Sequence, residues 1–420
     1  MLTAQSPQQL FQLSQTLAVY SPALILSPDA WTLAVRYDGN GMELDGPGNM
    51  AVDKDGNVWS TNNYKYDSSP STIVCGGQQL IKLAPTGSDA PGAPYSGGGL
   101  YGAGFGIAID PSNNVWVGNF GFKGMGCMDD LNLLARSISE FSADGTPLSG
   151  SGFTQGSVNQ PQGTASDQQG NIWIANCTGD SVTVYAGGNP DSNKNFNNTN
   201  NNLGLSRPFG LAIDGIGNAW VSSNYNNKVV GIAPNGMPLE AFTGAGIDAP
   251  LGVAADSLGN VWVANSGVVE LPCNGSDGGL KPPTSTFSIT EINRGGKQPK
   301  AVKFTGGGLR IPWGVAVDGN DNVWVANFGG QRLSEFCGAQ TANCPPGLHT
   351  GDPISPNTGY TFDGLTRNTG VVIDPSGNVW VANNWEIVPV QTNPGGHQFV
   401  VFVGLAAPVK TPMIGPPQRP

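Results

Sequence analysis

The sequence predicts an all-β fold, a seven-bladed β-propeller made of four-stranded antiparallel blades. A short motif recurs seven times along the 420 residues and is most complete at residues 314–327, GVAVDGNDNVWVAN. Each copy has the pattern of two short apolar strands joined by a tight turn. Both faces of these strands are apolar, which is typical of small sheets that pack against neighbours on both sides, as the blades of a propeller do.

The copies align on the aspartate that ends the first strand. An asparagine follows it by four positions and a tryptophan by six, at Asp53 and Trp59, Asp110 and Trp116, Asp167 and Trp173, Asp214 and Trp220, Asp256 and Trp262, Asp318 and Trp324, and Asp374 and Trp380. The residue before each asparagine is Gly, Asn or Asp, the types that best tolerate a left-handed backbone. We therefore predict a hairpin turn in which the aspartate accepts backbone N–H bonds.

Two further strands complete most copies. We predict third strands at residues 181–185, 228–232 and 332–336, and fourth strands at 239–242 and 301–304. Four strands in each of seven copies give seven blades.

The two ends of the chain decide how the ring closes. The last copy has a third strand at 398–403 and then a tail, 407–420, that is too rich in proline for a central strand. We predict that residues 31–37 supply the missing strand, so that residues 31–406 form the propeller. Residues 1–30 are expected to form a short helix or strap.

Insertions lengthen several copies beyond the 42-residue spacing that separates Asp214 from Asp256. They fall at residues 64–78, 121–135, 187–203, 273–286 and 337–360. Because loops vary while the blades supply a rigid frame, we expect the selectivity for a partner to lie in these insertions.

Charge excludes two classes of partner. The net charge is -11, with only 19 Lys and Arg and no basic cluster, so nucleic acid and anionic membranes are not expected partners. No apolar run is long enough to span a bilayer. The N-terminus of this chain has neither the basic nor the apolar region of a signal peptide.

Six cysteines and a weakly charged surface favour an extracytoplasmic location: secreted, cell-surface or periplasmic. Cys337 and Cys344 bracket a short loop and are expected to be bridged. Cys75 and Cys127 lie in insertions of neighbouring repeats and form our second expected bridge, which leaves Cys177 and Cys273 over. An even count fixes no connectivity, so six unbridged thiols remain the alternative.

The recurring Gly-Val-Ala-Val-Asp and Asn-Val-Trp-Val-Ala-Asn segments, quoted from residues 314–318 and 322–327, resemble the NHL-repeat propellers. Within them the chain is most similar to the bacterial streptogramin (virginiamycin B) lyase-like group, from Gly48 to about Val403. That resemblance implies a histidine base with acidic residues and a magnesium ion near the channel mouth. His349 and His397 are the two histidines, and both lie outside the repeated positions.

Metal sites of the zinc or copper type are not indicated, because no His and Cys stand at close spacing. Weak calcium candidates are Asp53 and Asp55 in one hairpin turn and Asp318 and Asp321 in another. Turn formation is the favoured interpretation of these four residues. No cofactor is predicted beyond a possible divalent cation, Ca²⁺ or Mg²⁺.

Ligand-binding candidates come from two patterns. Nine positions after each aspartate stands an almost unbroken ring of amides, including Asn119, Asn176, Asn265, Asn327 and Asn383. These amides would suit sugar hydroxyls or peptide groups, although bonding to the local backbone is the simpler interpretation. Aromatic residues outside the repeat fall near the strand ends where loops meet, and would suit stacking on a ligand: Trp313, Trp385, Phe209, Phe120 and Phe105.

Two functions are compatible with this pattern. The first is a binding or assembly module that presents a loop-rich face to a protein or glycan partner, alone or within a larger extracellular assembly. The alternative is a metal-assisted lyase or hydrolase similar to streptogramin lyase. A histidine that meets a carboxylate at the channel mouth would favour the enzyme.

Overall fold

The computed structural model describes residues 33–39, 42, 44–65, 75–123, 127–130, 134–274, 278–283, 285–295, 299–385, 396 and 398–420. The chain divides into two units, residues 1–33 and residues 34–420, and the second contains the propeller. The predicted strap at residues 1–30 lies outside the described residues. No helix among the described residues is long and apolar enough to cross a membrane.

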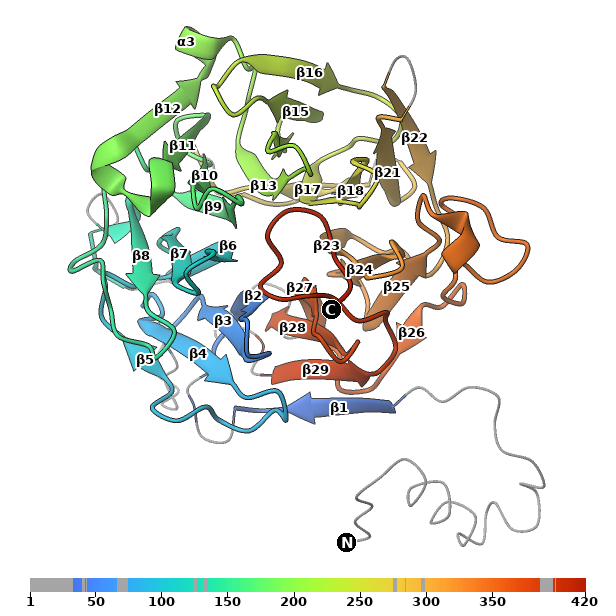
Figure 1. The fold of residues 1–420 in the computed structure, drawn as a ribbon, viewed down its shortest axis with the longest axis horizontal. Helices are drawn as coiled ribbons and strands as arrows, with labels where there is room; N and C mark the ends of the chain where they lie inside the picture. The colour runs from blue at the N-terminus through green and yellow to red at the C-terminus, as the bar shows by residue number, and fades with distance from the viewer. Residues whose placement is uncertain are drawn as a thin grey trace, which may run out of the picture. The chain divides into compact units, whose positions relative to one another are not determined.

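Seven antiparallel sheets form a ring in residues 34–420, as predicted (Figure 1). The innermost strands are β2 (Pro47–Val52), β6 (Ala103–Ile109), β9 (Pro161–Ser166), β13 (Pro208–Ile213), β17 (Pro250–Ala255), β23 (Pro312–Val317) and β27 (Arg367–Ile373). The second strands, which carry the tryptophans, are β3 (Val58–Asn62), β7 (Val115–Asn119), β10 (Ile172–Asn176), β14 (Ala219–Ser223), β18 (Val261–Asn265), β24 (Val323–Asn327) and β28 (Val379–Trp385).

The outer strands complete the blades. Third strands are β4 (Gln79–Leu83), β8 (Ser137–Phe141), β11 (Ser181–Tyr185), β15 (Lys228–Ile232), β21 (Ser288–Asn293), β25 (Arg332–Phe336) and β29 (Gln398–Val403). Fourth strands are β5 (Tyr95–Ser96), β12 (Asn193–Asn197), β16 (Pro238–Phe242), β22 (Lys300–Phe304) and β26 (Tyr360–Thr361). In the second blade only two isolated bridges, from Phe141 to Pro147 and from Ile138 to Phe153, occupy the place of a fourth strand.

Strand β1 (Leu33–Tyr37) lies at the outer edge of the last blade, in the order β1-β29-β28-β27. Tyr37 stacks on Trp380 of this blade with the ring centroids 5.6 Å apart, and its hydroxyl donates to the carbonyl of Thr86 in the first blade. Residues from the start of the propeller therefore complete its last blade and also contact its first.

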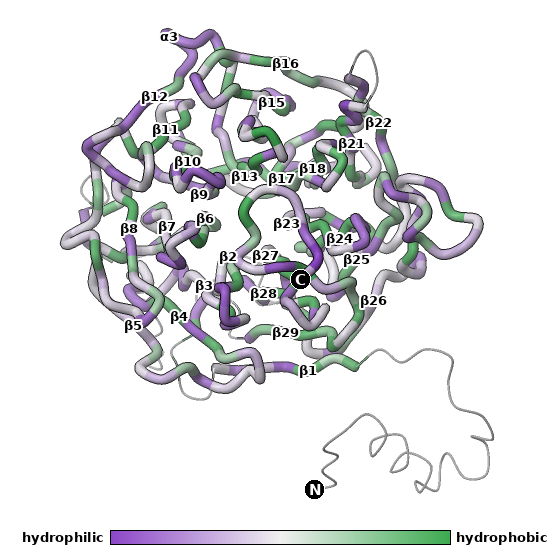
Figure 2. Tube along the Cα trace, in the orientation of Figure 1, coloured by the Kyte–Doolittle hydropathy of each residue, from purple (hydrophilic) through white to green (hydrophobic). Residues whose placement is uncertain are grey.

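Short elements lie in or directly beside the insertions. They are the hairpin β19 (Val269–Glu270) with β20 (Gly279–Leu280), the 3-10 turns η1 (Ala186–Gly188), η2 (Pro190–Ser192) and η3 (Thr341–Asn343), and the one-turn helix α3 (Asn198–Asn201). Figure 2 shows that α3, at the rim, is hydrophilic. The apolar side chains gather instead between adjacent blades, as in the cluster that joins Trp173 to Val221 and Ile232.

The repeated aspartate joins the turn to the strand that follows it. Asp53 Oδ1 accepts the N–H groups of Asp55 and Asn57, each at 2.9 Å, as the sequence predicted. Its other oxygen, Oδ2, accepts the indole N–H of Trp59 at 3.0 Å. The same indole bond, at 2.9–3.1 Å, recurs in all seven blades. The fixed offset of six residues thus has a physical cause.

A glycine near the start of most inner strands permits adjacent blades to approach. A Cβ built on Gly210 would lie 2.2 Å from the carbonyl oxygen of Leu251, and one built on Gly252 would lie 2.5 Å from that of Trp313. Both distances are too short for a side chain. Each inner strand has a break in its pairing register at the same place, so the bulge and the glycine together bring neighbouring backbones into contact.

The insertions lie on two faces rather than one. We call the end of the blades with the aspartate turns the turn face, and the opposite end the loop face. Strand alternation places the described ends of the insertions 64–78, 121–135 and 273–286 on the loop face, because each insertion joins a second strand to a third. The segments 187–203 and 337–360 follow third strands and begin on the turn face. The expectation of one loop-rich face is therefore only partly correct. The prediction of 187–203 as a loop insertion is wrong in part, because residues 193–197 form the fourth strand β12 of the third blade.

Candidate functional site

The inner strands of all seven blades surround an axial cavity of about 220 Å³. Its lining is mostly backbone and small or apolar side chains. Among the polar lining residues, Asn49 donates to the carbonyl of Phe105 at 2.9 Å and Thr369 donates to that of Gly48 at 2.7 Å. The Thr164 hydroxyl lines the same cavity without a protein partner. No described carboxylate or histidine lines this cavity.

The C-terminal tail closes the cavity at the turn face (Figure 1). Ala407 donates its N–H to Asp318 Oδ2 at 3.2 Å, and the Thr411 hydroxyl donates to the carbonyl of Asp53 at 2.7 Å. Val409 is fully buried between these anchors. Thr411 and Met413 then lie against the cavity itself. The tail is no strand, as predicted from its prolines, but it forms a cap.

Aromatic side chains close the cavity at the loop face. The five predicted binding aromatics belong to one cluster with Phe122 and Phe328 or pack against it: Phe105, Phe120, Phe209, Trp313 and Trp385. The Trp313 ring lies 5.1 Å from that of Phe105 and 5.0 Å from that of Phe328, between centroids. The sequence correctly suggested that these residues gather where loops meet. Because four of the five are at most 8% exposed, they form a wall and leave little surface for stacking.

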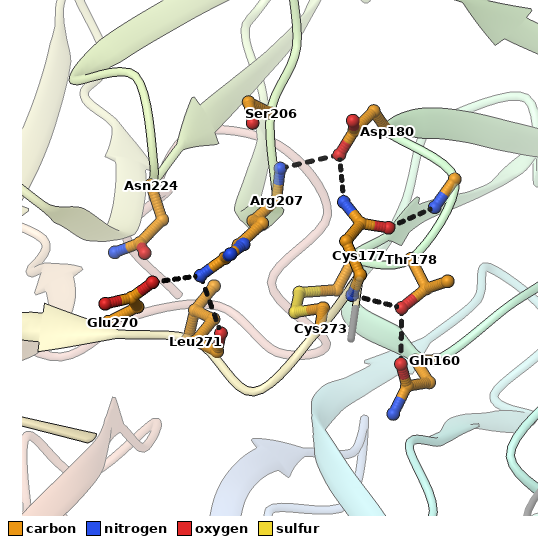
Figure 3. Close-up of a disulfide and its surroundings, with 12 residues drawn as sticks. Gln160, Cys177, Thr178, Asp180, Ser206, Arg207, Asn224, Glu270, Leu271 and Cys273 are labelled. Carbon is orange, nitrogen blue, oxygen red and sulfur yellow. Dashed lines mark hydrogen bonds and ion pairs between the residues drawn. A yellow bond between two sulfur atoms is a disulfide. The ribbon is translucent and has the colours of Figure 1, made fainter. Parts of the chain in front are cut away.

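A disulfide crosses the loop face beside this wall (Figure 3). It joins Cys177, which follows the second strand of the third blade, to Cys273 in the insertion of the fifth blade. Both cysteines belong to the aromatic cluster and are at most 1% exposed. No bridge between these two cysteines was predicted from the sequence, because nothing in the sequence places the insertion of the fifth blade next to the third blade.

Polar contacts hold the same insertion on the loop face. Asn274 receives a hydrogen bond from the backbone N–H of Gly179 and donates to Asp180, at 3.1 and 2.9 Å. Arg207 pairs with Glu270 at 2.7 Å and lies over the ring of Tyr225. Figure 3 shows Arg207 and Glu270 on one side of the disulfide and Asp180 on the other. The arrangement is a clasp in which Glu270 pairs with both Lys281 and Arg207, and the hydrogen bonds from Lys281 and then from Arg207 lower the pKa of Glu270.

The other two bridges are Cys75–Cys127 and Cys337–Cys344. The first joins the insertions of the first and second blades on the loop face. The second closes a loop after β25 on the turn face. The described residues contain no free cysteine.

The ring of amides belongs to the frame of the blades. Asn119, Asn176, Asn265, Asn327 and Asn383 are at most 1% exposed. In the second blade, the Nδ2 group of Asn119 donates to the hydroxyls of Ser137 and Ser139, and its Oδ1 accepts the N–H of Tyr101. Comparable bonds to third-strand hydroxyls recur at the other positions except Asn383, whose Nδ2 donates to the carbonyl of Gly364. Burial therefore separates these amides from any ligand in solution.

The weak calcium candidates are engaged by hydrogen-bond donors. Asp53 and Asp318 hold their own turns and the tryptophans that follow. Asp321 accepts bonds from the backbone and hydroxyl of Ser257 and from Gln340, while the exposed Asp55 pairs with Lys54. Their geometry is that of structural turns.

The structure describes one of the two histidines. His349 is 87% exposed in its side chain, contacts Asp352 at 3.3 Å, and does not line the axial cavity. His397 lies outside the described residues.

Three glutamates, of which Glu291 and Glu335 are buried and Glu140 is half-buried, share a position in their blades that the sequence pattern did not single out. Glu140, Glu291 and Glu335 stand on third strands directly opposite the tryptophans of their blades. Burial, together with the nearby charge of Asp110, Asp256 or Asp318, raises their pKa values to about 7, about 7 and about 8. Opposite each tryptophan the other blades carry Lys82, Val184, Gly231 or Val401. Aligning the third strands on the tryptophans would have indicated this position.

Fold and comparisons agree on the class of protein. The chain is a seven-bladed β-propeller, and its residues 309–336 match the NHL repeat. A comparison with curated proteins found no match.

Among solved structures, the chain is similar to a streptogramin B lyase at 13% identity and a TM-score of 0.58, over 89% of this chain and 99% of that one. It is similar to virginiamycin B lyase from Staphylococcus aureus at 12% identity and 0.58, with the same coverage. It is also similar to the extracellular domain of a hybrid two-component system protein from B. thetaiotaomicron, at 14% identity and 0.53, over 89% of this chain and 41% of that one. At such identities the likeness concerns the fold.

Proposed function

We propose that the protein is an extracytoplasmic binding or assembly module that recognises a protein or glycan partner on its loop face. The observation that carries this proposal is the axial cavity, which is closed by the tail on one face and by the aromatic wall on the other. A central channel is a common place for a propeller to hold a substrate or ion. A partner of this chain must bind the outside of the frame.

The surroundings of the loop face support this proposal. Two of the three disulfides and the Arg207 clasp anchor the described parts of its insertions, which lowers the entropic cost of binding a ligand there. Disulfides persist in oxidising compartments, which supports a location outside the cytoplasm. The extracellular domain of the two-component system protein among the similar structures has a similar fold in such a location.

The second candidate is a metal-assisted lyase or hydrolase, favoured by the similarity to two streptogramin-type lyases. Its requirements are a base and acidic metal ligands near the axis. The axial cavity has neither among its described lining residues, and His349 lies apart from it. We therefore rank it below the binding module.

A metal analysis paired with thermal unfolding tests the two candidates. For a binding module we expect no stoichiometric divalent ion in the purified protein and the same melting temperature with and without EDTA. A bound ion whose removal lowers the melting temperature would favour the metal-assisted enzyme instead.

Incubation with virginiamycin B and Mg²⁺ tests the enzyme directly. We expect the antibiotic to remain intact by mass spectrometry. Time-dependent ring opening, abolished by EDTA, would replace the binding module with the lyase.

A further inference from the structure

A second pocket, of about 330 Å³, lies on the loop face between the sixth and seventh blades. Its walls come from the start of β23, from the turn between β24 and β25, and from the segment between β26 and β27. Three arginines line it: Arg310, Arg332 and Arg367. The chain has only 19 Lys and Arg in 420 residues at a net charge of -11, so this concentration of positive charge needs a cause.

The backbone around the pocket holds the arginines in place. Asn327 accepts the N–H of Arg310, and the carbonyl of Arg310 accepts the N–H of Gly329 in the facing turn. Gln331 donates to the carbonyl of Leu365 at 2.8 Å, which ties that turn to the next blade. The pocket is therefore formed before any ligand arrives.

Two of the guanidinium groups form no ion pair with any described residue. Within the described residues, no carboxylate lies within 4.0 Å of Arg310 or Arg332. The Nε atom of Arg332 is buried and has no hydrogen-bond partner. Arg367 lies over the ring of Phe328, and its pKa is lowered by burial and by the charge of Arg310. These positive groups repel one another, which favours binding of an anion.

The remaining lining residues narrow the chemistry of that anion. Asp363 is the one carboxylate among the described lining residues, and its charge disfavours a multiply charged phosphate. Asp363 can instead accept a hydrogen bond from a hydroxyl of a ligand whose neighbouring carboxylate carries a single charge. The half-buried ring of Phe362 offers an apolar surface for one face of a sugar ring. Planar guanidinium groups match the two oxygens of a carboxylate.

We propose that this pocket binds the carboxylate of a uronic-acid saccharide, with Arg310 and Arg332 on the carboxylate and Asp363 on a hydroxyl. This inference rests on the proposed binding function and names its ligand class.

Calorimetric titration with trigalacturonate tests the assignment. The matched probe is its fully methyl-esterified form, which keeps the sugar rings and removes the charge. We expect trigalacturonate to bind and the ester to bind at least about ten-fold more weakly. Binding of the acid should also weaken as salt is raised. Equal binding of acid and ester, or no binding of the acid at millimolar concentration, would overturn the proposal.

Variants locate the site. Arg310→Gln and Arg332→Gln should each weaken binding about ten-fold or more, and Arg332→Lys should weaken it less because charge without the planar fork remains. Arg36→Gln, on the exposed outer strand β1, is the matched control and should leave binding unchanged. Melting temperatures establish that each variant is folded. Folded pocket variants that bind like the parent protein would refute the site.

Other ligands separate the possible failures. A glutamate-rich peptide or inorganic phosphate that binds more tightly than the saccharide would overturn the ligand class. Mass spectrometry of the recovered saccharide distinguishes failure of the proposed binding function from failure of the proposed ligand site. If trigalacturonate is cleaved, the pocket still binds a uronic acid, but the protein is an enzyme and the binding module is refuted. Tight binding of a neutral glycan at another site, without cleavage, would support the binding module and refute the arginine pocket as its ligand site.

Discussion

At the scale of the residue, the aspartate and tryptophan of each copy act as one unit. In the fifth blade Asp256 accepts two backbone N–H groups on Oδ1, at 3.0 and 2.9 Å, and the indole N–H of Trp262 on Oδ2 at 3.0 Å. Both side chains are fully buried. Removing one member therefore leaves a buried polar group short of a partner.

Trp262→Phe should lower the free energy of unfolding by about 1–3 kcal/mol, because Asp256 loses a donor and the smaller ring leaves space. Urea titration monitored by circular dichroism measures this change. Tyr225→Phe, at a ring that is 55% exposed, is the control and should stay within about 0.5 kcal/mol. Equal stability of the two variants would contradict the role of the indole bond.

The buried glutamates predict how stability depends on pH. Burial raises the pKa of Glu335 to about 8 and that of Glu291 to about 7, both above the ordinary value of 4.5. The folded protein thus holds these protons more tightly than the unfolded chain. Their stabilisation is complete below about pH 4.5 and is lost as pH rises through 7 to 8.

Glu335→Gln should therefore flatten the decline in melting temperature between pH 5 and pH 8.5. The exposed Glu240→Gln on β16 is the control and should keep the slope of the parent protein. A slope unchanged by Glu335→Gln would mean that this carboxyl is already ionised in the fold at neutral pH.

At the scale of the element, the inner strands depend on close contact between backbones. A Cβ on Gly252 would lie 2.5 Å from the carbonyl oxygen of Trp313 and 3.0 Å from the nitrogen of Val315. Neither backbone atom can move without shifting β23 away from β17. The glycine thus governs the packing of the fifth blade against the sixth.

Gly252→Ala should lower the free energy of unfolding by about 1–3 kcal/mol through this steric conflict. Gly215→Ala is the matched control, because its Cβ would meet only Pro416 at 3.8 Å and its backbone does not need a positive φ. Chemical denaturation of both variants compares the two sites, and a neutral Gly252→Ala would show that the blades can separate freely.

At the scale of the whole molecule, both ends of the chain complete the ring. Strand β1 closes the last blade, while the tail crosses the turn face and closes the axial cavity. Val409 is a fully buried apolar anchor of that tail, and it packs in the cluster that contains Trp324 and Phe402.

Val409→Asp should release the tail, because an unpaired carboxylate cannot remain in that cluster. Trypsin should then cleave faster after the neighbouring Lys410, and the melting temperature should fall. Arg419→Ala removes only exposed contacts and should leave both properties unchanged. If trypsin cleaves Val409→Asp no faster than the parent protein, Val409 is not the main anchor of the tail.

The sequence by itself determined the number of blades, the hairpin turns and most of the third and fourth strands, because each depends on local residues at fixed offsets. The aspartate turn and the tryptophan that follows it occur in seven copies, and each copy forms the same hydrogen bonds. Two of the three disulfides were also predicted from where their cysteines lie among the repeats.

Only the tertiary structure decided which side chains reach a ligand. The aromatic residues outside the repeat were predicted to stack on a ligand, yet the ring brings them together as a largely buried wall. The amides, for which local bonding was the simpler interpretation, are buried in the frame of the blades. The Cys177–Cys273 bridge, the cap formed by the tail and the arginine pocket each join segments that are distant in sequence. Their geometry follows from the closure of the ring, which no local pattern of residues encodes.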